Sequence, residues 1–190
     1  MLARARVDCP QAEFRQADLA SWMPGTVPDL LYSNATFQWV PDHMQVLSRL
    51  TGRLQPGGVL AVQMPDNLAE PSHRLMQEVA EAGPWAAKLG KASAARSILP
   101  APTAYYALLK PLFQRLDIWH TSYNHPLDGA PGILDWLMTT GLRPYLAPLD
   151  SEEQAAYLAI YEARVAKAYV AMPDGKVLLR LPRLFMVGVR

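Results

Sequence analysis

The chain has 190 residues, of which 51% are hydrophobic and 18% charged, and its formal net charge is +1. This composition is typical of one globular, soluble domain, and it excludes a disordered chain and a basic nucleic-acid-binding protein. The apolar runs are far shorter than the roughly 20 residues that cross a bilayer, so we expect no membrane contact. Cys9 is the only cysteine, which excludes an intrachain disulfide and favours a reducing, cytoplasmic location.

The first third of the sequence alternates between strand-like and helix-like patterns. Residues 28–34 are apolar with a polar end, and residues 58–65 form a nearly continuous apolar run, as a strand buried on both faces requires. Between them, apolar residues recur at spacings of three and four from Met44, which predicts an amphipathic helix. The elements expected in this part are a helical stub at 1–7, strands at 12–17, 28–34 and 58–65, and a helix at 41–54.

The rest of the chain predicts more helix and two further strands. Helix is expected over residues 70–99, broken near Gly83 and again near Gly90. A capping box that starts at Ser151 is expected to begin the last helix. The basic residues expected on the solvated side of the 70–99 stretch are Lys88, Lys91 and Arg96. The remaining expected elements are helices at 103–112, 131–140 and 151–171 and strands at 116–125 and 177–189.

This order of elements predicts the fold class. Strands that alternate with helices indicate an open α/β sheet with crossover helices. No linker rich in glycine, serine or proline divides the chain, so we expect residues 1–190 to form a single domain. The stretches at 70–103 and 131–171 are expected to be helical insertions in that domain.

Polar residues follow three of the expected strands. In open parallel sheets, ligands bind beyond the carboxyl ends of the strands, so these residues are candidates for a site. Asp18 follows the first strand, and its carboxylate can accept a hydrogen bond from an adenine amine. The small residues Asn34 and Ala35 follow the second strand and let the backbone approach a ligand closely, and residues 64–67 follow the third. These strand ends predict a pocket for a nucleotide-like cofactor.

Four segments carry a resemblance that covers most of the chain. They read AEFRQADL, DLLYSNATFQWVPDH, LQPGGVLAVQMPDN and RLFMVGVR. Together they resemble the class I S-adenosylmethionine-dependent methyltransferases, and only residues 83–101 fit that pattern poorly. The resemblance implies a Rossmann-like fold, S-adenosylmethionine as the cofactor, and O-methylation of a carboxylate of a small polycarboxylic acid like trans-aconitate.

The same resemblance implies roles for particular residues. Those implied to bind the cofactor are Asp18 and Leu19 at the adenine and Asn34 and Ala35 at the methionine end. Those implied to border the small carboxylic acid substrate are Gln38 and Trp39.

The sequence departs from the family at its amino-terminal end. The family's sheet begins with a strand, a glycine-rich GxGxG loop and a second strand, and the resemblance starts after all three, as in an N-terminally truncated member. Gly57 and Gly58 cannot replace that loop, because they precede a strand and do not join a strand to a helix. We therefore expect a sheet that lacks its first two strands and an exposed edge at residues 28–34 that permits self-association. We also expect this chain alone to bind the cofactor weakly or not at all.

The implied reaction sets what the substrate site must contain. A carboxylate is already ionised at neutral pH, so its methylation needs positioning rather than a general base or another catalytic residue. The other negative charges of the substrate need fixed donors, and arginine can bind a carboxylate through two parallel hydrogen bonds. By their place in segments that resemble the family, the substrate-binding candidates are Arg143, Arg183, His73, Tyr105, Tyr106 and Gln38.

Other interpretations of these residues stay open. Asp18 could cap the turn that follows it, and Trp39 could be a core aromatic residue. Arg143 could complement a helix carboxyl end, while Arg183 could form a surface ion pair. Of the two adjacent tyrosines, one is expected in the core, because neighbouring helix positions face different ways. The four histidines lack metal-ligand spacing, so we expect no metal site.

Two other functions are compatible with the sequence. One is methylation of a different acceptor, such as a malonyl thioester, because one scaffold serves many substrates. The other is a non-enzymatic role, in which a truncated paralogue pairs with another chain.

Overall fold

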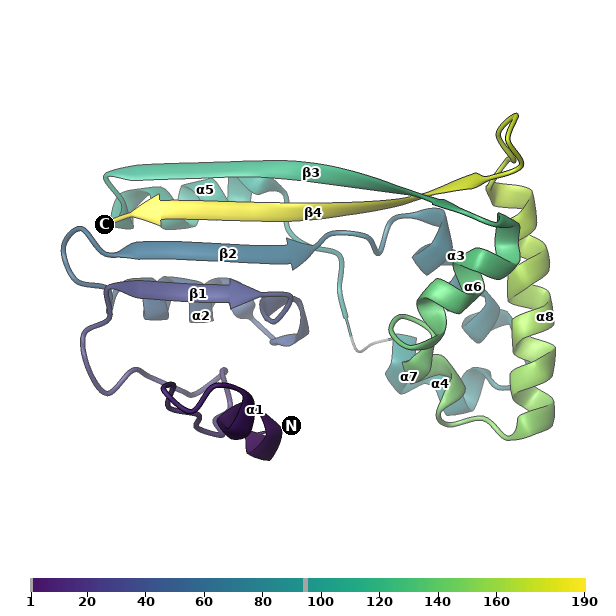
Figure 1. The fold of residues 1–190 in the computed structure, drawn as a ribbon, viewed down its shortest axis with the longest axis horizontal. Coiled ribbons are helices and arrows are strands. Elements are labelled where there is room, and N and C mark those ends of the chain that lie inside the picture. Colours follow the sequence, from purple (N-terminus) through teal and green to yellow (C-terminus); the bar gives the residue numbers. More distant parts are fainter. Residues whose placement is uncertain (1, 94–95) are drawn as a thin grey trace.

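A computed structural model describes residues 2–93 and 96–190 (Figure 1). The strands are β1 (Leu30–Asn34), β2 (Val59–Pro65), β3 (Arg115–Leu127) and β4 (Val177–Val189). The α-helices are α1 (Leu2–Asp8), α2 (His43–Thr51), α3 (Pro71–Ala82), α4 (Ala86–Ser93), α5 (Pro102–Leu109), α6 (Gly129–Met138), α7 (Arg143–Leu146) and α8 (Ser151–Ala168). Two 3-10 helices are η1 (Phe37–Trp39) and η2 (Lys110–Leu112). Within the described ranges, no helix is long and apolar enough to cross a membrane.

The strands form one mixed sheet in the order β1-β2-β4-β3. β1 and β2 run parallel, with Asn34 opposite Gln63, while β4 pairs antiparallel with both β2 and β3. The parallel pair requires a crossover, which η1 and α2 provide. The sheet with its crossover helices confirms the expected α/β fold class. In the part of the chain that the structure describes, β1 is an edge strand whose partner is β2.

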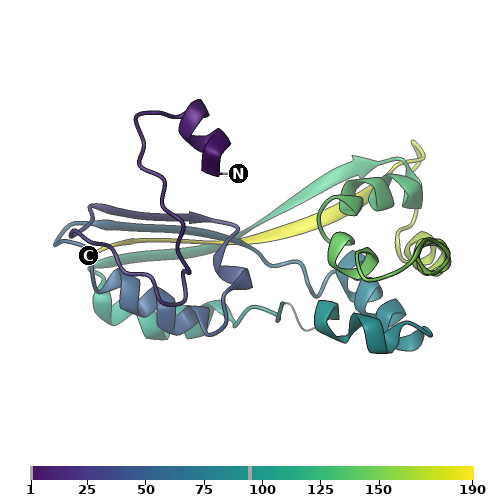
Figure 2. The ribbon, with the colours of Figure 1, turned by 90° about the horizontal axis from the view of Figure 1, so that it is seen from below.

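Two long strands, β3 and β4, join two helical groups (Figures 1 and 2). In Figure 2, α2 and α5 lie beneath one end of the sheet, and α3, α4, α6, α7 and α8 gather at the other end. The two groups enclose separate cores, one around the buried Leu47 and Tyr105 and one around Trp85 and Tyr157. The helices of this second group fall around residues 70–103 and 131–171, and their description as insertions in a single domain stays a prediction.

The two cores use opposite faces of β4. Near the start of the strand, Val177, Leu179 and Leu181 are buried in the core that contains α3, α6 and α8. Near its end, Leu184 and Met186 are buried in the core that contains α2 and α5. Successive side chains of a strand point to opposite faces, so the change from odd to even positions moves the buried face from one side to the other. This change occurs near residues 182 and 183, where the two halves meet.

The strand expected at residues 12–17 is absent. These residues form neither helix nor strand, and apart from the half-buried Phe14 their side chains are exposed. A strand needs a neighbour to satisfy its backbone groups, and within the described residues β1 pairs with β2 and not with this segment. The segment instead runs past the sheet as a loop, shown in dark purple in Figure 2.

The helical stretch after β2 breaks once where two breaks were expected. The break at Gly83 is confirmed: its backbone is extended before a proline, a residue that disfavours helix at the preceding position. Only glycine fits there, because a Cβ atom would lie 2.3 Å from the Trp85 ring. The Trp85 indole fills this space and donates a hydrogen bond to the Val79 carbonyl at 3.0 Å. The break expected near Gly90 is wrong, because α4 continues through that residue. Buried Leu89 anchors α4, which offsets the weak helix propensity of the adjacent glycine.

The last helix begins with a capping box one residue earlier than expected. Asp150, not Ser151, is the N-cap, and its carboxylate accepts hydrogen bonds from the backbone N–H groups of Glu152 and Glu153. The Glu153 side chain accepts a hydrogen bond from the Asp150 backbone N–H in return. A carboxylate also interacts favourably with the positive end of the helix dipole, so the aspartate is the better cap of the two.

Replacing Asp150 by alanine is expected to lower the free energy of unfolding by about 1 kcal/mol, because α8 loses its cap. Ser151→Ala is the matched control, and we expect it to change the free energy by less than about 0.5 kcal/mol. Urea unfolding followed by circular dichroism measures both. Equal losses in the two variants would show that the cap does not lie at Asp150.

Candidate functional site

A cavity of about 500 Å³ lies where the two halves of the molecule meet. Its walls come from η1, the loop after β2, helices α3, α4, α6 and α7, and residues 181–183 of β4. The cavity therefore sits beyond the carboxyl ends of β1 and β2 and at the change of faces along β4. Its volume is in the range of small-molecule sites.

The cavity lining is positively charged. Among its described residues, Arg96, Arg143 and Arg183 carry guanidinium groups, and none is an aspartate or glutamate. The polar residues between them include Asn67 and His73. Among the described residues none of these three guanidinium groups has an ion pair, so each is a binding group for an anion, and together they fit a ligand with several negative charges.

Arg183 is held on the floor of the cavity by two neighbours. Its Nη1 atom donates to Oε1 of Gln63 at 3.2 Å, and its Cζ atom lies 5.7 Å from the centroid of the Tyr123 ring. Strand register places it there, because Arg183 is opposite Pro65 at the carboxyl end of β2. Neither contact neutralises the charge, so the guanidinium keeps donors for a ligand.

Arg143 begins α7 and also lines the cavity, and its side chain is exposed. Within the described residues its guanidinium has no ion pair. The turn before it closes against α3 at Gly141, where a Cβ atom would lie 3.1 Å from Cε of Met76 and 3.4 Å from Nε2 of His73. The small residue thus lets α7 approach α3 and brings Arg143 to the cavity.

Arg96 follows α4 and lies in the cavity wall, so the expectation of a solvated side chain there is wrong. Its Nη2 atom donates to the Pro65 carbonyl at 3.3 Å and to Oδ1 of Asn67 at 3.4 Å. Its Cζ atom lies 5.0 Å from the centroid of the Trp39 ring. Burial lowers the pKa of Arg96 from its usual value, and the group remains charged at neutral pH.

A chain of hydrogen bonds leads from Arg96 to the interior. Arg96 can only donate, so it fixes Oδ1 of Asn67 toward itself and turns the amide Nδ2 toward His73. Nδ2 donates to Nε2 of His73 at 3.1 Å, which leaves the ring proton on Nδ1. Nδ1 then donates to Oγ of Ser72 at 3.1 Å. Both ring nitrogens of His73 are therefore engaged within the protein, and the histidine holds Asn67 in place.

His73 is neutral at physiological pH. The side chain is only 7% exposed, and burial lowers its pKa to about 4, with a further contribution from the positive charge of Arg96. A neutral imidazole is required for the hydrogen-bond chain, because a protonated ring could not accept from Asn67.

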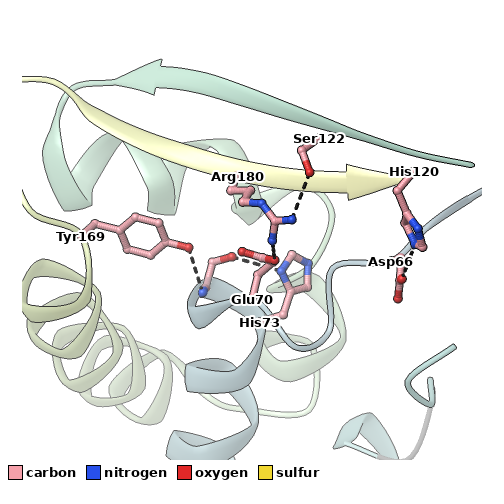
Figure 3. Close-up of polar contacts among 8 residues, drawn as sticks. Asp66, Glu70, His73, His120, Ser122, Tyr169 and Arg180 are labelled. Carbon is pink, nitrogen blue, oxygen red and sulfur yellow. Dashed lines mark hydrogen bonds and ion pairs between the residues drawn. The ribbon is translucent and has the colours of Figure 1, made fainter. Parts of the chain in front are cut away.

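Polar contacts fix the first turn of α3, which carries His73 (Figure 3). Arg180 of β4 forms an ion pair with Glu70 and donates to Oγ of Ser122 at 3.1 Å. The Tyr169 hydroxyl accepts a hydrogen bond from the Ser72 backbone N–H at 3.1 Å. These bonds tie the start of α3 to the sheet and to the end of α8, so the helix cannot shift without breaking them.

The side of the cavity at β1 contains a tight turn and an unpaired acceptor. Ala35 has φ 53°, in the left-handed region that a non-glycine residue seldom adopts, and its N–H donates to the Gln63 carbonyl at 2.9 Å. Nε2 of Gln38 donates to the Ala35 carbonyl at 2.7 Å, while Oε1 is buried without a partner in the described structure. An unused acceptor beside a tight turn suits a ligand that carries an ammonium group.

The structure brings together six of the residues that the sequence nominated. Those that line the cavity are Ala35, Gln38, Trp39, His73, Arg143 and Arg183. They come from the turn after β1, from η1, and from α3, α7 and β4, which are far apart in the sequence. Trp39 is 51% exposed, so the alternative of a core tryptophan does not hold.

The residues nominated for adenine lie away from this cavity. The Asp18 carboxylate accepts a hydrogen bond from the Ala20 N–H at 2.9 Å, within the turn that it was alternatively expected to cap. Leu19 lines a separate hollow beside Trp22 and Thr26. Their contact with a cofactor remains a prediction from the resemblance.

The remaining nominated residues also lie outside the cavity lining. Asn34 ends β1 with an exposed side chain. Tyr105 is fully buried, and its hydroxyl lies 2.7 Å from Nε2 of His43, so it joins α5 to α2. Tyr106, its neighbour, is 48% exposed. The expectation that one of the two tyrosines is in the core is confirmed for Tyr105.

Sequence reasoning missed Arg96 and Trp136 in the cavity lining. Arg96 stands among small residues in the segment that fitted the family pattern poorly, and nothing in its neighbourhood distinguishes it from a surface arginine. Trp136 lies on α6 and packs on His125, with ring centroids 4.6 Å apart. The sequence signal for Trp136 was a large aromatic residue on a short amphipathic helix, and the same signal is typical of a residue in the core.

Comparisons with known proteins agree on one family. The model of a methyltransferase domain matches residues 1–62. A trans-aconitate 2-methyltransferase of Rhodopseudomonas palustris (strain BisB5) is 55% identical over 190 residues, which cover 100% of this chain and 74% of that protein. The trans-aconitate 2-methyltransferase of Agrobacterium fabrum (strain C58) is 52% identical over the same shares of both chains.

Solved structures support the fold independently of sequence. The protein BH2331 of Bacillus halodurans C-125, described as a methyltransferase, aligns with a TM-score of 0.52 at 14% identity, over 99% of this chain and 85% of that chain. The YcgJ protein of a Bacillus species aligns with a TM-score of 0.56 at 13% identity, over 100% and 78% of the two chains. At this identity the likeness shows the fold alone.

Proposed function

This chain belongs to the trans-aconitate 2-methyltransferase family, and on that premise we propose that it transfers the methyl group of S-adenosylmethionine to a carboxylate of trans-aconitate. The predicted resemblance to class I methyltransferases is confirmed by the same relatives. They give no support to a malonyl thioester as acceptor or to a non-enzymatic role.

One observation of the structure carries the choice of substrate. The cavity contains three arginines and, among its described lining residues, no carboxylate. trans-Aconitate carries three carboxylates, all ionised at neutral pH. Each guanidinium can bind one carboxylate through charge-assisted hydrogen bonds, so the charges of the cavity and of the ligand match.

The protein's part in the reaction is to bind and orient. S-adenosylmethionine supplies an electrophilic methyl group, which a carboxylate oxygen takes up as the carbon–sulfur bond breaks and leaves its electron pair on sulfur. Arg143 and Arg183 are two of the groups that bind and orient the substrate's carboxylates, which positions the reacting oxygen. No proton needs to move, so His73 serves as a neutral support and not as a base.

Ala35 and Gln38 are the residues of the cavity that fit the methionine end of the cofactor. The tight turn at Ala35 brings backbone to the cavity, and the unpaired oxygen of Gln38 accepts a hydrogen bond. Asp18 and Leu19 are proposed at the adenine on the strength of the resemblance. The cytoplasm is the proposed location, because the lone cysteine is compatible with a reducing compartment.

The proposal is tested by product analysis with the purified chain. We expect the monomethyl ester of trans-aconitate, identified by mass spectrometry, when the chain is incubated with trans-aconitate and millimolar S-adenosylmethionine. Malonyl thioesters are the comparison acceptor. Ester formation on the thioester with none on trans-aconitate would overturn the assignment.

A further inference from the structure

We propose that Arg96 binds one particular carboxylate of the substrate and thereby selects a tricarboxylate over a dicarboxylate. The inference rests on the proposed function and assigns a specificity role to a residue in a segment that the family pattern fits poorly.

The hydrogen bonds of Arg96 leave most of its capacity unused. Its Nε atom is buried and has no partner among the described residues. The two contacts of Nη2, to the Pro65 carbonyl and to Asn67, are long at 3.3 and 3.4 Å, and both acceptors are neutral. A buried donor without a partner is costly, and a ligand oxygen would satisfy it.

No protein carboxylate takes this place. Asp66 raises the pKa of Arg96 through space, but its own carboxylate is 2.9 Å from Nε2 of His120 and bonds there (Figure 3). Arg96 is thus a charged group in the cavity wall without an ion pair among the described residues. Charged side chains in partly buried places are normally paired, so the missing partner points to an anionic ligand.

The neighbours of Arg96 fix the position of its guanidinium group in the cavity wall. The Trp39 ring lies against the guanidinium, with 5.0 Å between Cζ and the ring centroid, and stabilises the positive charge. Asn67 bonds it from another side and is itself fixed by His73. A guanidinium with a fixed position can distinguish ligands by the placement of a carboxylate, whereas a mobile one adds charge attraction only.

A purely structural role makes a different prediction. If Arg96 only ties the segment after α4 to Pro65 and Trp39, its removal deforms the cavity for every ligand alike. If it binds a carboxylate, its removal affects only ligands that present that carboxylate. The two roles are separated by pairing the variant with ligands that each lack one carboxyl group.

The experiment is calorimetric titration of the full chain with trans-aconitate and three dicarboxylates. Mesaconate, cis-glutaconate and itaconate each lack a different carboxyl group of trans-aconitate and keep its double-bond geometry. The variants are Arg96→Met and Arg96→Lys, and lysine keeps the positive charge but cannot donate two parallel hydrogen bonds to a carboxylate. Arg115→Met is the matched control, because Arg115 is an exposed arginine paired with Asp117 at the other end of β3.

Arg96→Met is expected to weaken trans-aconitate binding by about 10- to 100-fold, the loss of one charge-assisted hydrogen-bonded contact. For one of the dicarboxylates the same variant is expected to change the affinity by less than about threefold. Arg96→Lys should lose less than Arg96→Met, and Arg115→Met should behave as the unmodified chain.

Three outcomes would overturn the inference. Equal weakening for all four ligands would assign Arg96 a structural role and leave the proposed function standing. Unchanged binding of trans-aconitate to Arg96→Met would remove any role in recognition, again without touching the proposed function. If the unmodified chain bound none of the four acids, the proposed substrate and the role of Arg96 would fall together.

Discussion

Exchange of both Arg143 and Arg183 for methionine is expected to weaken trans-aconitate binding by about 1000-fold. Each arginine contributes a charge-assisted contact to one carboxylate, and two such contacts are worth about 4 kcal/mol. The two residues come from different elements of the cavity lining, one at the start of α7 and one in β4, so their single effects should add. Each single variant is expected to lose about 10- to 100-fold.

The measurement combines calorimetric binding with kcat and KM for ester formation. Positioning of the substrate predicts that kcat/KM falls at least as far as the affinity does. The control is the charge-matched double variant Arg115→Met with Arg164→Met, whose arginines form exposed ion pairs outside the cavity. A double cavity variant within about threefold of the unmodified chain, with an unchanged circular dichroism spectrum, would show that these arginines do not bind the substrate.

The sequence predicts those elements whose pattern is local. Residues 177–189 alternate in a long apolar strand, and β4 occupies this range. The apolar run at 58–65 likewise becomes β2, buried between β1 and β4. The segment at 12–17 has similar alternation but no strand forms, because strand formation depends on a partner elsewhere in the chain. A pattern of side chains cannot show whether that partner is present.

The candidate site was predicted to the extent that it follows from strand ends. Ala35 and Gln38 come directly after β1, and the rule for open sheets places them at the ligand. Arg96 does not follow a strand, so this rule does not apply to it; its position depends on the path of the chain after α4. Tyr105 shows the reverse case: its family segment suggested the site, but it is buried against His43 and lies outside the cavity lining, so its contact with substrate stays a prediction. Long-range packing decides both cases.

The stability of the protein is expected to fall by about 2 kcal/mol between pH 7 and pH 5 through His73 alone. Burial lowers the pKa of His73 to about 4 in the folded chain, against 6.5 for an ordinary histidine. Below pH 6.5 His73 therefore binds a proton in the unfolded chain but not in the folded chain, and this stabilises the unfolded state. The loss continues until the pH reaches about 4, where the folded chain is also protonated.

Urea unfolding at pH 7 and pH 5 measures this loss, with His73→Gln as the comparison. The variant should be less stable than the unmodified chain at pH 7, because the glutamine amide cannot replace both ring contacts. Because glutamine does not titrate, the variant should then lose about 2 kcal/mol less on acidification. Part of the pH dependence should survive in the variant, since burial also lowers the pKa of His43. In the folded chain His73 takes up its proton only near pH 4, so the bond from Asn67 that steadies Arg96 should break, and trans-aconitate affinity should fall, only as the pH approaches 4. Identical pH profiles for the variant and the unmodified chain would mean that His73 is already accessible to protons in the folded state, and that the hydrogen-bond chain from Arg96 to Ser72 does not form.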